Sequence, residues 1–247
     1  MFRWPFRARS YLPPEEEEWH IETWRWLLDS FGGLPVLSQA NLVIPTRSFF
    51  PPTDAVGHDR VLHVFEAVKK HARMANWECK LVAQARRPDF LEHHHAAAGT
   101  FSVDGGAASI TYDPDLIDEP VKLVATLAHE LAHYFLGAQL PPGGEDTLEP
   151  ATDLTAAYLG FGVFGANVAL TFEQHRDVFS YGWSSSRLGY LNEGGWTFAL
   201  AVFAFLRRDT VEPLEPYLKP HLYTELRKAM AYLRREPSPV RALTSGT

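Results

Sequence analysis

The stretch "PVKLVATLAHELAHYFL", residues 120–136, places His129 and His133 four positions apart, with Glu130 beside the first of them. A proline opens the stretch and Gly137 follows it, a combination typical of the two ends of a helix. The other residues around the histidines are mostly apolar. The stretch therefore predicts a largely buried helix that carries three polar side chains.

These three side chains form the pattern H-E-x-x-H. Residues i and i+4 share one face of a helix, so His129 and His133 can reach the same ion. Glu130 would point to the adjoining side, where it could take a proton from a water molecule on the metal. A buried His–Glu–His group without a metal would cost several kcal/mol in unpaired polar atoms. The pattern therefore predicts metal binding.

A catalytic zinc site needs a third protein ligand, with water in the fourth position. The segment "LEPATD" supplies Glu149 and, one helical turn later, Asp153. Glu149 could complete the ligand set, and Asp153 could accept the N–H of one histidine and so orient it. Pro150 directly follows Glu149, which leaves Glu145 and Asp146 as rival third ligands. In the plainer interpretation, Glu149 only stabilises the N-terminus of its helix, where acidic side chains are favourable, and Asp153 is an ordinary surface residue.

"HELAH" followed by "EPATD" resembles the gluzincin metallopeptidases, and the similarity covers roughly residues 100–172. It is closest to compact bacterial zincin-like domains. The resemblance implies one Zn²⁺ ion bound by His129, His133 and Glu149. It also implies Glu130 as the general base and Asp153 behind His129.

Peptide hydrolysis also needs a group that stabilises the developing oxyanion. The segment "HRDVFSYGWSSSRLGYLNEGG" offers His175, Tyr181, Arg187 and Tyr190. Tyr190 is favoured as a catalytic residue, with Arg187 one turn before it, because both precede a helix expected to pack behind the site. Most aromatic residues are simply part of a core, which is the competing interpretation for the tyrosine.

Composition limits the class of protein. The chain has 247 residues, 46% hydrophobic and 21% charged, as expected for one sizeable globular domain. Its net charge of −7 argues against nucleic acid as a partner. Cys79 is the only cysteine, so no intrachain disulfide can form. "MFRWPFRARS" lacks the apolar run of a signal peptide, so a cytoplasmic location is expected.

The order of helical and strand-like segments predicts an α+β, zincin-like fold, in which a small mixed or antiparallel sheet packs on helices. Residues 1–18 are expected to be a mobile leader and residues 19–235 a single domain, of which 19–75 are a helical elaboration. Residues 236–247 are expected to be a disordered tail. The run Ser109 to Tyr112 is predicted to be a sheet edge, where an extended peptide or protein substrate binds by strand addition.

Three segments have alternative interpretations. Leu154 to Phe172 is near the length of a membrane span, but its glycines favour a helical hairpin or a glycine-broken core helix. The G-x-G-x-x-G pattern from Gly160 to Gly165 follows a helix instead of a strand, so it indicates close packing or a helix break and no nucleotide site. The run His93 to His95 is interpreted as surface.

The sequence thus favours a soluble zinc metallopeptidase in which Glu130 activates water. Mn or Fe remain open as metals, because two histidines and a carboxylate accept several ions. A second hypothesis is a catalytically dormant zincin-like module that senses or binds a partner. A third is a membrane-embedded protease that uses residues 154–172.

Overall fold

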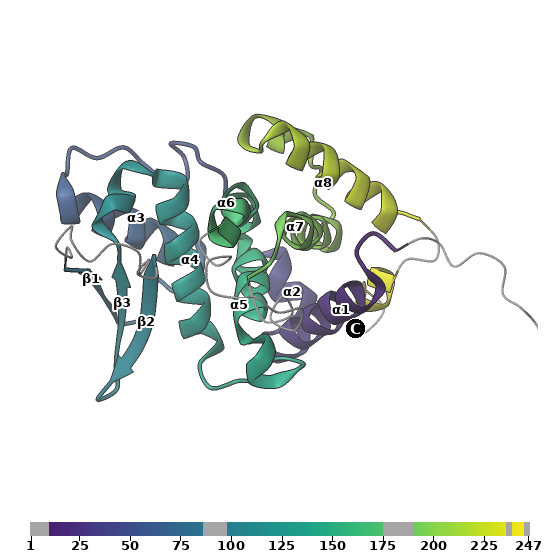
Figure 1. Ribbon diagram of the computed structural model, residues 1–247, viewed down its shortest axis with the longest axis horizontal. Helices are drawn as coiled ribbons and strands as arrows, with labels where there is room; N and C mark the ends of the chain where they lie inside the picture. The colour runs from purple at the N-terminus through teal and green to yellow at the C-terminus, as the bar shows by residue number, and fades with distance from the viewer. Residues whose placement is uncertain (1–9, 86–97, 175–189, 236–238, 245–247) are drawn as a thin grey trace, which may run out of the picture.

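The computed structural model describes residues 10–85, 98–174, 190–235 and 239–244 (Figure 1). These residues form a mostly helical α+β fold with one small sheet. In chain order, the elements are α1 (Pro14–Ser30), α2 (Gly33–Ser38), α3 (Gly57–His71), β1 (Cys79–Ala83), β2 (Gly99–Asp104), β3 (Ala107–Tyr112), η1 (Pro114–Asp118), α4 (Pro120–Leu136), η2 (Gly144–Thr147), α5 (Leu148–Ala156), η3 (Ala157–Phe161), α6 (Gly162–Gln174), α7 (Glu193–Arg207), η5 (Glu212–Tyr217), α8 (Pro220–Leu233) and η6 (Pro239–Thr244).

The sheet is mixed, with strand order β1-β3-β2. β2 and β3 form an antiparallel hairpin, whereas β1 pairs with β3 in parallel, so that Leu81 lies beside Ile110. The prediction that Ser109 to Tyr112 forms a sheet edge is wrong, because these residues belong to the central strand. The hairpin leaves one side of β3 unpaired, and β1 covers the main-chain groups that would otherwise be exposed there.

Helix α4 lies between the sheet and helices α5 and α6 (Figure 1). It contacts β2 and β3 on one side and α5 and α6 on the other. Its bounds, Pro120–Leu136, are those predicted from the sequence. Because α4 has packed neighbours on both sides, it needs apolar residues around most of its circumference, as its sequence shows. The H-E-x-x-H residues are therefore held on a rigid central element.

The N-terminal boundary of the folded chain lies earlier than predicted. Residues 14–18 are the first turn of α1, and the prediction that they belong to a mobile leader is wrong. Pro14 and three glutamates are favourable at a helix start, where N–H groups lack partners. Glu17 is buried and accepts hydrogen bonds from the main-chain N–H of Tyr11, at 2.8 Å, and the hydroxyl of Tyr232, at 2.5 Å. Residues 1–9 lie outside the described part of the chain.

The predicted disordered tail is wrong for residues 239–244. They form η6, which contacts α1, α7 and α8. Val240 and Leu243 are buried there, so a short apolar segment adds to the core after α8. The rest of the tail, residues 236–238 and 245–247, is not among the described residues.

The segment 154–172 is a broken core helix, as the glycines predicted. α5 and α6 are joined by one π-helical turn, in which Gly160 has a φ of 103°. Its carbonyl accepts the N–H of Val43 at 2.9 Å, and the carbonyl oxygen of Asn41 occupies the place where a Cβ would lie. Among the described residues, no helix has the length and apolar character needed to cross a membrane.

We expect Gly160→Ala to lower the free energy of unfolding by about 2–5 kcal/mol, since strain from the positive φ adds to a main-chain collision. Gly105→Ala is the matched control, because Gly105 also has a positive φ, 54°, but no atom within 4 Å of a built Cβ. That variant should lose only the strain, about 1–2 kcal/mol. Urea denaturation measures both, and equal losses would contradict the collision.

Candidate metal centre

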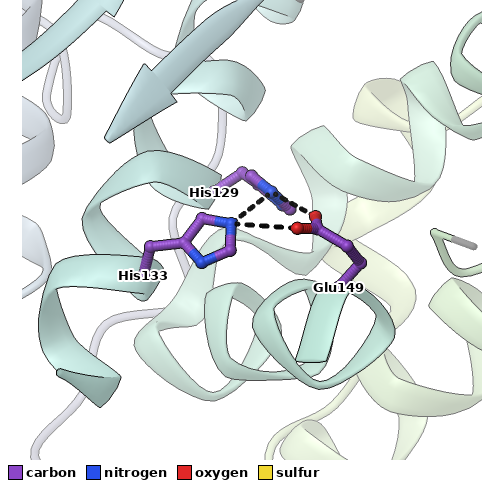
Figure 2. A group of neighbouring side chains, drawn as sticks. All are labelled: His129, His133 and Glu149. Atoms are coloured by element: carbon purple, nitrogen blue, oxygen red, sulfur yellow. Dashed lines mark hydrogen bonds and ion pairs between the residues drawn. The ribbon is translucent and has the colours of Figure 1, made fainter. Parts of the chain in front are cut away.

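Two histidines of α4 and one glutamate of α5 converge on a single point (Figure 2). One ligand atom from each of His129, His133 and Glu149 lies within 4.8 Å of the others. The two Nε2 atoms are 3.1 Å apart, and the two carboxylate oxygens of Glu149 lie 3.3 Å and 3.7 Å from them. Two imidazole nitrogens and a carboxylate are a ligand set suited to zinc. The structure thus brings together the three ligands expected from the sequence.

Glu149 reaches this point because α5 begins beside the C-terminal half of α4. It occupies the first turn of α5, where Pro150 costs no hydrogen bond, since first-turn N–H groups have no partner within the helix. Two hydrogen bonds fix the segment before α5. The carbonyl of Pro142 accepts one from the Thr147 hydroxyl, at 2.7 Å, and one from the Trp19 indole N–H, at 3.2 Å.

The rival third ligands do not join the group. Glu145 and Asp146 lie in η2, and both side chains are exposed. In the described part of the chain, the only group of His, Cys, Asp and Glu that could hold a metal is the one completed by Glu149.

Asp153 orients the first histidine. Its Oδ1 accepts a hydrogen bond of 2.8 Å from Nδ1 of His129, so Nε2 is the nitrogen that faces the cluster. Its Oδ2 accepts the main-chain N–H of Leu191, also at 2.8 Å. The spacing alone left open which histidine Asp153 would contact, the resemblance implied His129, and the structure places Asp153 against His129. Asp153 also connects the site to the segment just before α7.

Thr152 stands in the equivalent place for the second histidine, a role that the sequence analysis missed. Its hydroxyl donates to the carbonyl of Leu148 at 2.8 Å, which leaves a lone pair facing Nδ1 of His133 at 3.4 Å. The contact is long, so its effect should be weaker than that of Asp153. In many helices a threonine hydroxyl donates to a main-chain carbonyl one turn earlier, so a threonine at this position does not by itself indicate a contact with His133.

We expect Asp153→Asn to weaken zinc binding by about 10–100-fold, since the supporting acceptor of His129 loses its charge. Thr152→Val should weaken binding less. Thr155→Val is its matched control, because Thr155 is buried and makes the same hydroxyl-to-carbonyl bond one turn away. Competition with a chromophoric chelator measures each affinity. Equal affinities for the Asp153 variant and the wild type would contradict the orienting role.

The protonation of the cluster follows from burial and mutual contacts. Burial alone would lower the pKa of His129, but hydrogen bonds with Asp153 and Glu149 outweigh it and raise the pKa to about 10. The hydrogen bonds from His129 and His133 hold the pKa of Glu149 far below its usual range. At neutral pH the metal-free cluster therefore keeps a proton between histidine and carboxylate, in the place that a cation would occupy.

This proton predicts a pH dependence. His129 stays protonated below its folded pKa of about 10 and loses the proton when zinc binds, so zinc affinity should rise with pH up to about 10. In the metal-free protein, protonated His129 stabilises the fold. This contribution is fully present below pH 6.5, the ordinary pKa of histidine, and is lost as the pH rises through the folded pKa of about 10. Calorimetry at pH 8 in buffers of different ionisation enthalpy should show release of about one proton. Release of none would contradict the assignment.

Glu130 faces the sheet from α4. It is 6% exposed, and the main-chain N–H of Phe101 in β2 lies near enough to its carboxylate to lower the pKa of Glu130. Burial raises the pKa of Glu130, partly offset by the two histidines. The close approach of β2 depends on Gly99, where a Cβ would lie 2.7 Å from Thr126 and 3.0 Å from Glu130. Main-chain donors leave no trace in a sequence pattern, which is why Phe101 was not foreseen.

Tyr190 lies beside the cluster. Its ring centroid is 5.2 Å from that of His129, with the rings inclined at 60°. Its role in stabilising an oxyanion stays a prediction. The other candidates for this role, His175, Tyr181 and Arg187, lie outside the described residues, as does the run from His93 to His95.

A scan against protein-family models, a search of curated proteins and a search of solved structures each found no match to this chain.

Proposed function

We propose that the chain is a zinc-dependent metallopeptidase of the gluzincin type with a zincin-like fold. The observation that carries the proposal is the convergence of His129, His133 and Glu149 beside the buried carboxylate of Glu130. Three protein ligands are the number found in catalytic zinc sites, which keep one position open, whereas structural sites use four.

Zn²⁺ held by these ligands would polarise the substrate carbonyl and lower the pKa of a water molecule. Glu130 takes the proton from the attacking water and passes it to the leaving amine. Its raised pKa suits this role, because a stronger base accepts the proton more readily. The N–H of Phe101 lies near this carboxylate, and the phenol of Tyr190 beside His129 donates to the oxygen that gains charge.

The outer edge of β2 is the place for a peptide substrate. Asp113 donates to the carbonyl of Ala98 at 3.0 Å, and hydrogen-bonded pairs alternate along an antiparallel ladder. The N–H and C=O of Phe101 therefore point away from β3, on the side of Glu130. Among the described residues β2 pairs only with β3, so an extended peptide can add to its other side. This edge replaces the one predicted at Ser109 to Tyr112.

Digestion of a broad peptide mixture tests the proposal. The zinc-loaded protein should generate new peptide termini, a chelator should stop their formation, and added zinc should restore it. Bound zinc without any cleavage would reject the peptidase and favour the alternative, a catalytically dormant zincin-like module that binds a partner.

A further inference from the structure

The two faces of β2 differ sharply in polarity. Thr100 and Ser102 lie on the face away from α4, where their hydroxyls bond to those of Thr111, at 2.7 Å, and Ser109, at 2.9 Å. Phe101 lies on the α4 face and stacks on Tyr134, with ring centroids 5.2 Å apart. Side chains alternate along a strand, so Val103 shares that face.

Val103 is unusually accessible for a residue on a sheet edge, since 59% of it is exposed. Exposed edges are commonly protected by charged residues, especially lysine. The opposite edge strand, β1, carries the exposed Lys80, whereas β2 has no charge before Asp104 at the hairpin turn. An unprotected apolar edge beside Glu130 is consistent with a surface that binds an extended chain.

Strand pairing determines which substrate side chains meet this surface. In an antiparallel pair, directly opposite side chains share a face, with Cβ atoms about 4.5–5.5 Å apart. A peptide residue opposite Phe101 would thus point to the α4 side and contact its ring. That residue lies beside Glu130 and hence beside the cleaved bond. In a peptide that pairs antiparallel with β2, the residue opposite Val103 lies two positions nearer the N-terminus of the peptide than the residue opposite Phe101.

We propose that Phe101 and Val103 select extended substrates with two apolar side chains separated by one residue. The first is beside the cleaved bond and the second two positions towards the N-terminus. The intervening side chain would lie over Ser102 on the polar face, so the preferred substrate segment alternates apolar and polar residues. This inference rests on the proposed peptidase function and deepens it.

Cleavage-site profiling of a proteome-derived peptide library tests the inference. The zinc-loaded wild type should show enrichment of apolar residues at both positions. Val103→Glu should abolish the apolar preference at the outer position and favour lysine or arginine there by about two- to fivefold, the range expected for an opposite-charge pair across strands. Val82→Glu is the matched control, because Val82 is 46% exposed on the other edge strand, and it should retain the wild-type profile.

The outcomes separate the inference from the function on which it rests. An unchanged profile in the Val103 variant overturns the inference and leaves the peptidase standing, and so does an apolar preference confined to the C-terminal side of the cleaved bond. The same shift in the Val82 variant also overturns it. If the wild type binds zinc and cleaves nothing, the proposed function fails and the inference fails with it.

Discussion

Glu130→Gln should leave zinc bound and lower the rate of peptide hydrolysis by a factor on the order of 10²–10⁴, the usual contribution of a general base. Glu130 does not belong to the group of converging ligand atoms, so its replacement leaves that group intact. Glutamine has nearly the same shape, and its carbonyl oxygen can still face the N–H of Phe101. It cannot take a proton from water, however, so the loss should fall on kcat.

Zinc content and steady-state kinetics measured on the same preparation test this prediction. Glu145→Gln is the matched control, since Glu145 is an exposed acid near the site that makes no part of the cluster. It should retain both zinc and activity. Hydrolysis at the wild-type rate by the Glu130 variant would contradict the proposed role of this carboxylate.

Glu149→Ala should reduce zinc affinity by more than about 100-fold, which exceeds the 10–100-fold cost of losing a residue that only supports a ligand. The variant removes the carboxylate whose oxygens lie 3.3 Å and 3.7 Å from the two Nε2 atoms. Zinc at 100 times its dissociation constant stabilises the wild type by about 2.7 kcal/mol. At the same zinc concentration the variant should lose most of that stabilisation.

Thermal unfolding with and without zinc measures this effect. Glu145→Ala and Asp146→Ala are the controls, because both acids lie in the loop just before α5 and were rivals for the third ligand position. Both should keep the zinc-dependent rise in Tm. If either of these variants lost the zinc-dependent rise in Tm and the Glu149 variant kept it, the third ligand would be Glu145 or Asp146 instead of Glu149.

The parts of the molecule that were predictable depend on local chemistry. A proline and a glycine mark the ends of α4, and the spacing of two histidines places both on one face. Glu149 was predictable because a two-histidine site needs a third ligand, and the chain offers acids soon after the motif. The break at Gly160 was predictable from the glycines in an otherwise apolar helix.

The parts that escaped prediction depend on contacts between distant segments. Nothing local in β3 shows that β1 will pair with its free side, so a central strand was mistaken for an edge. Four consecutive glutamates suggest a solvated leader until Glu17 is seen to bind Tyr11 and Tyr232. The donor near Glu130 is a main-chain N–H, which every non-proline residue possesses.

On the proposed function, this chain holds one zinc ion with three protein ligands and an open fourth position. A crystal structure of the zinc-loaded protein, with anomalous data at the zinc edge, tests it most directly. We predict zinc bonded to Nε2 of His129, Nε2 of His133 and a carboxylate oxygen of Glu149, at about 2.0–2.2 Å, with the fourth position accessible to solvent. Zinc elsewhere, or a fourth protein ligand that closes the site, would contradict the account.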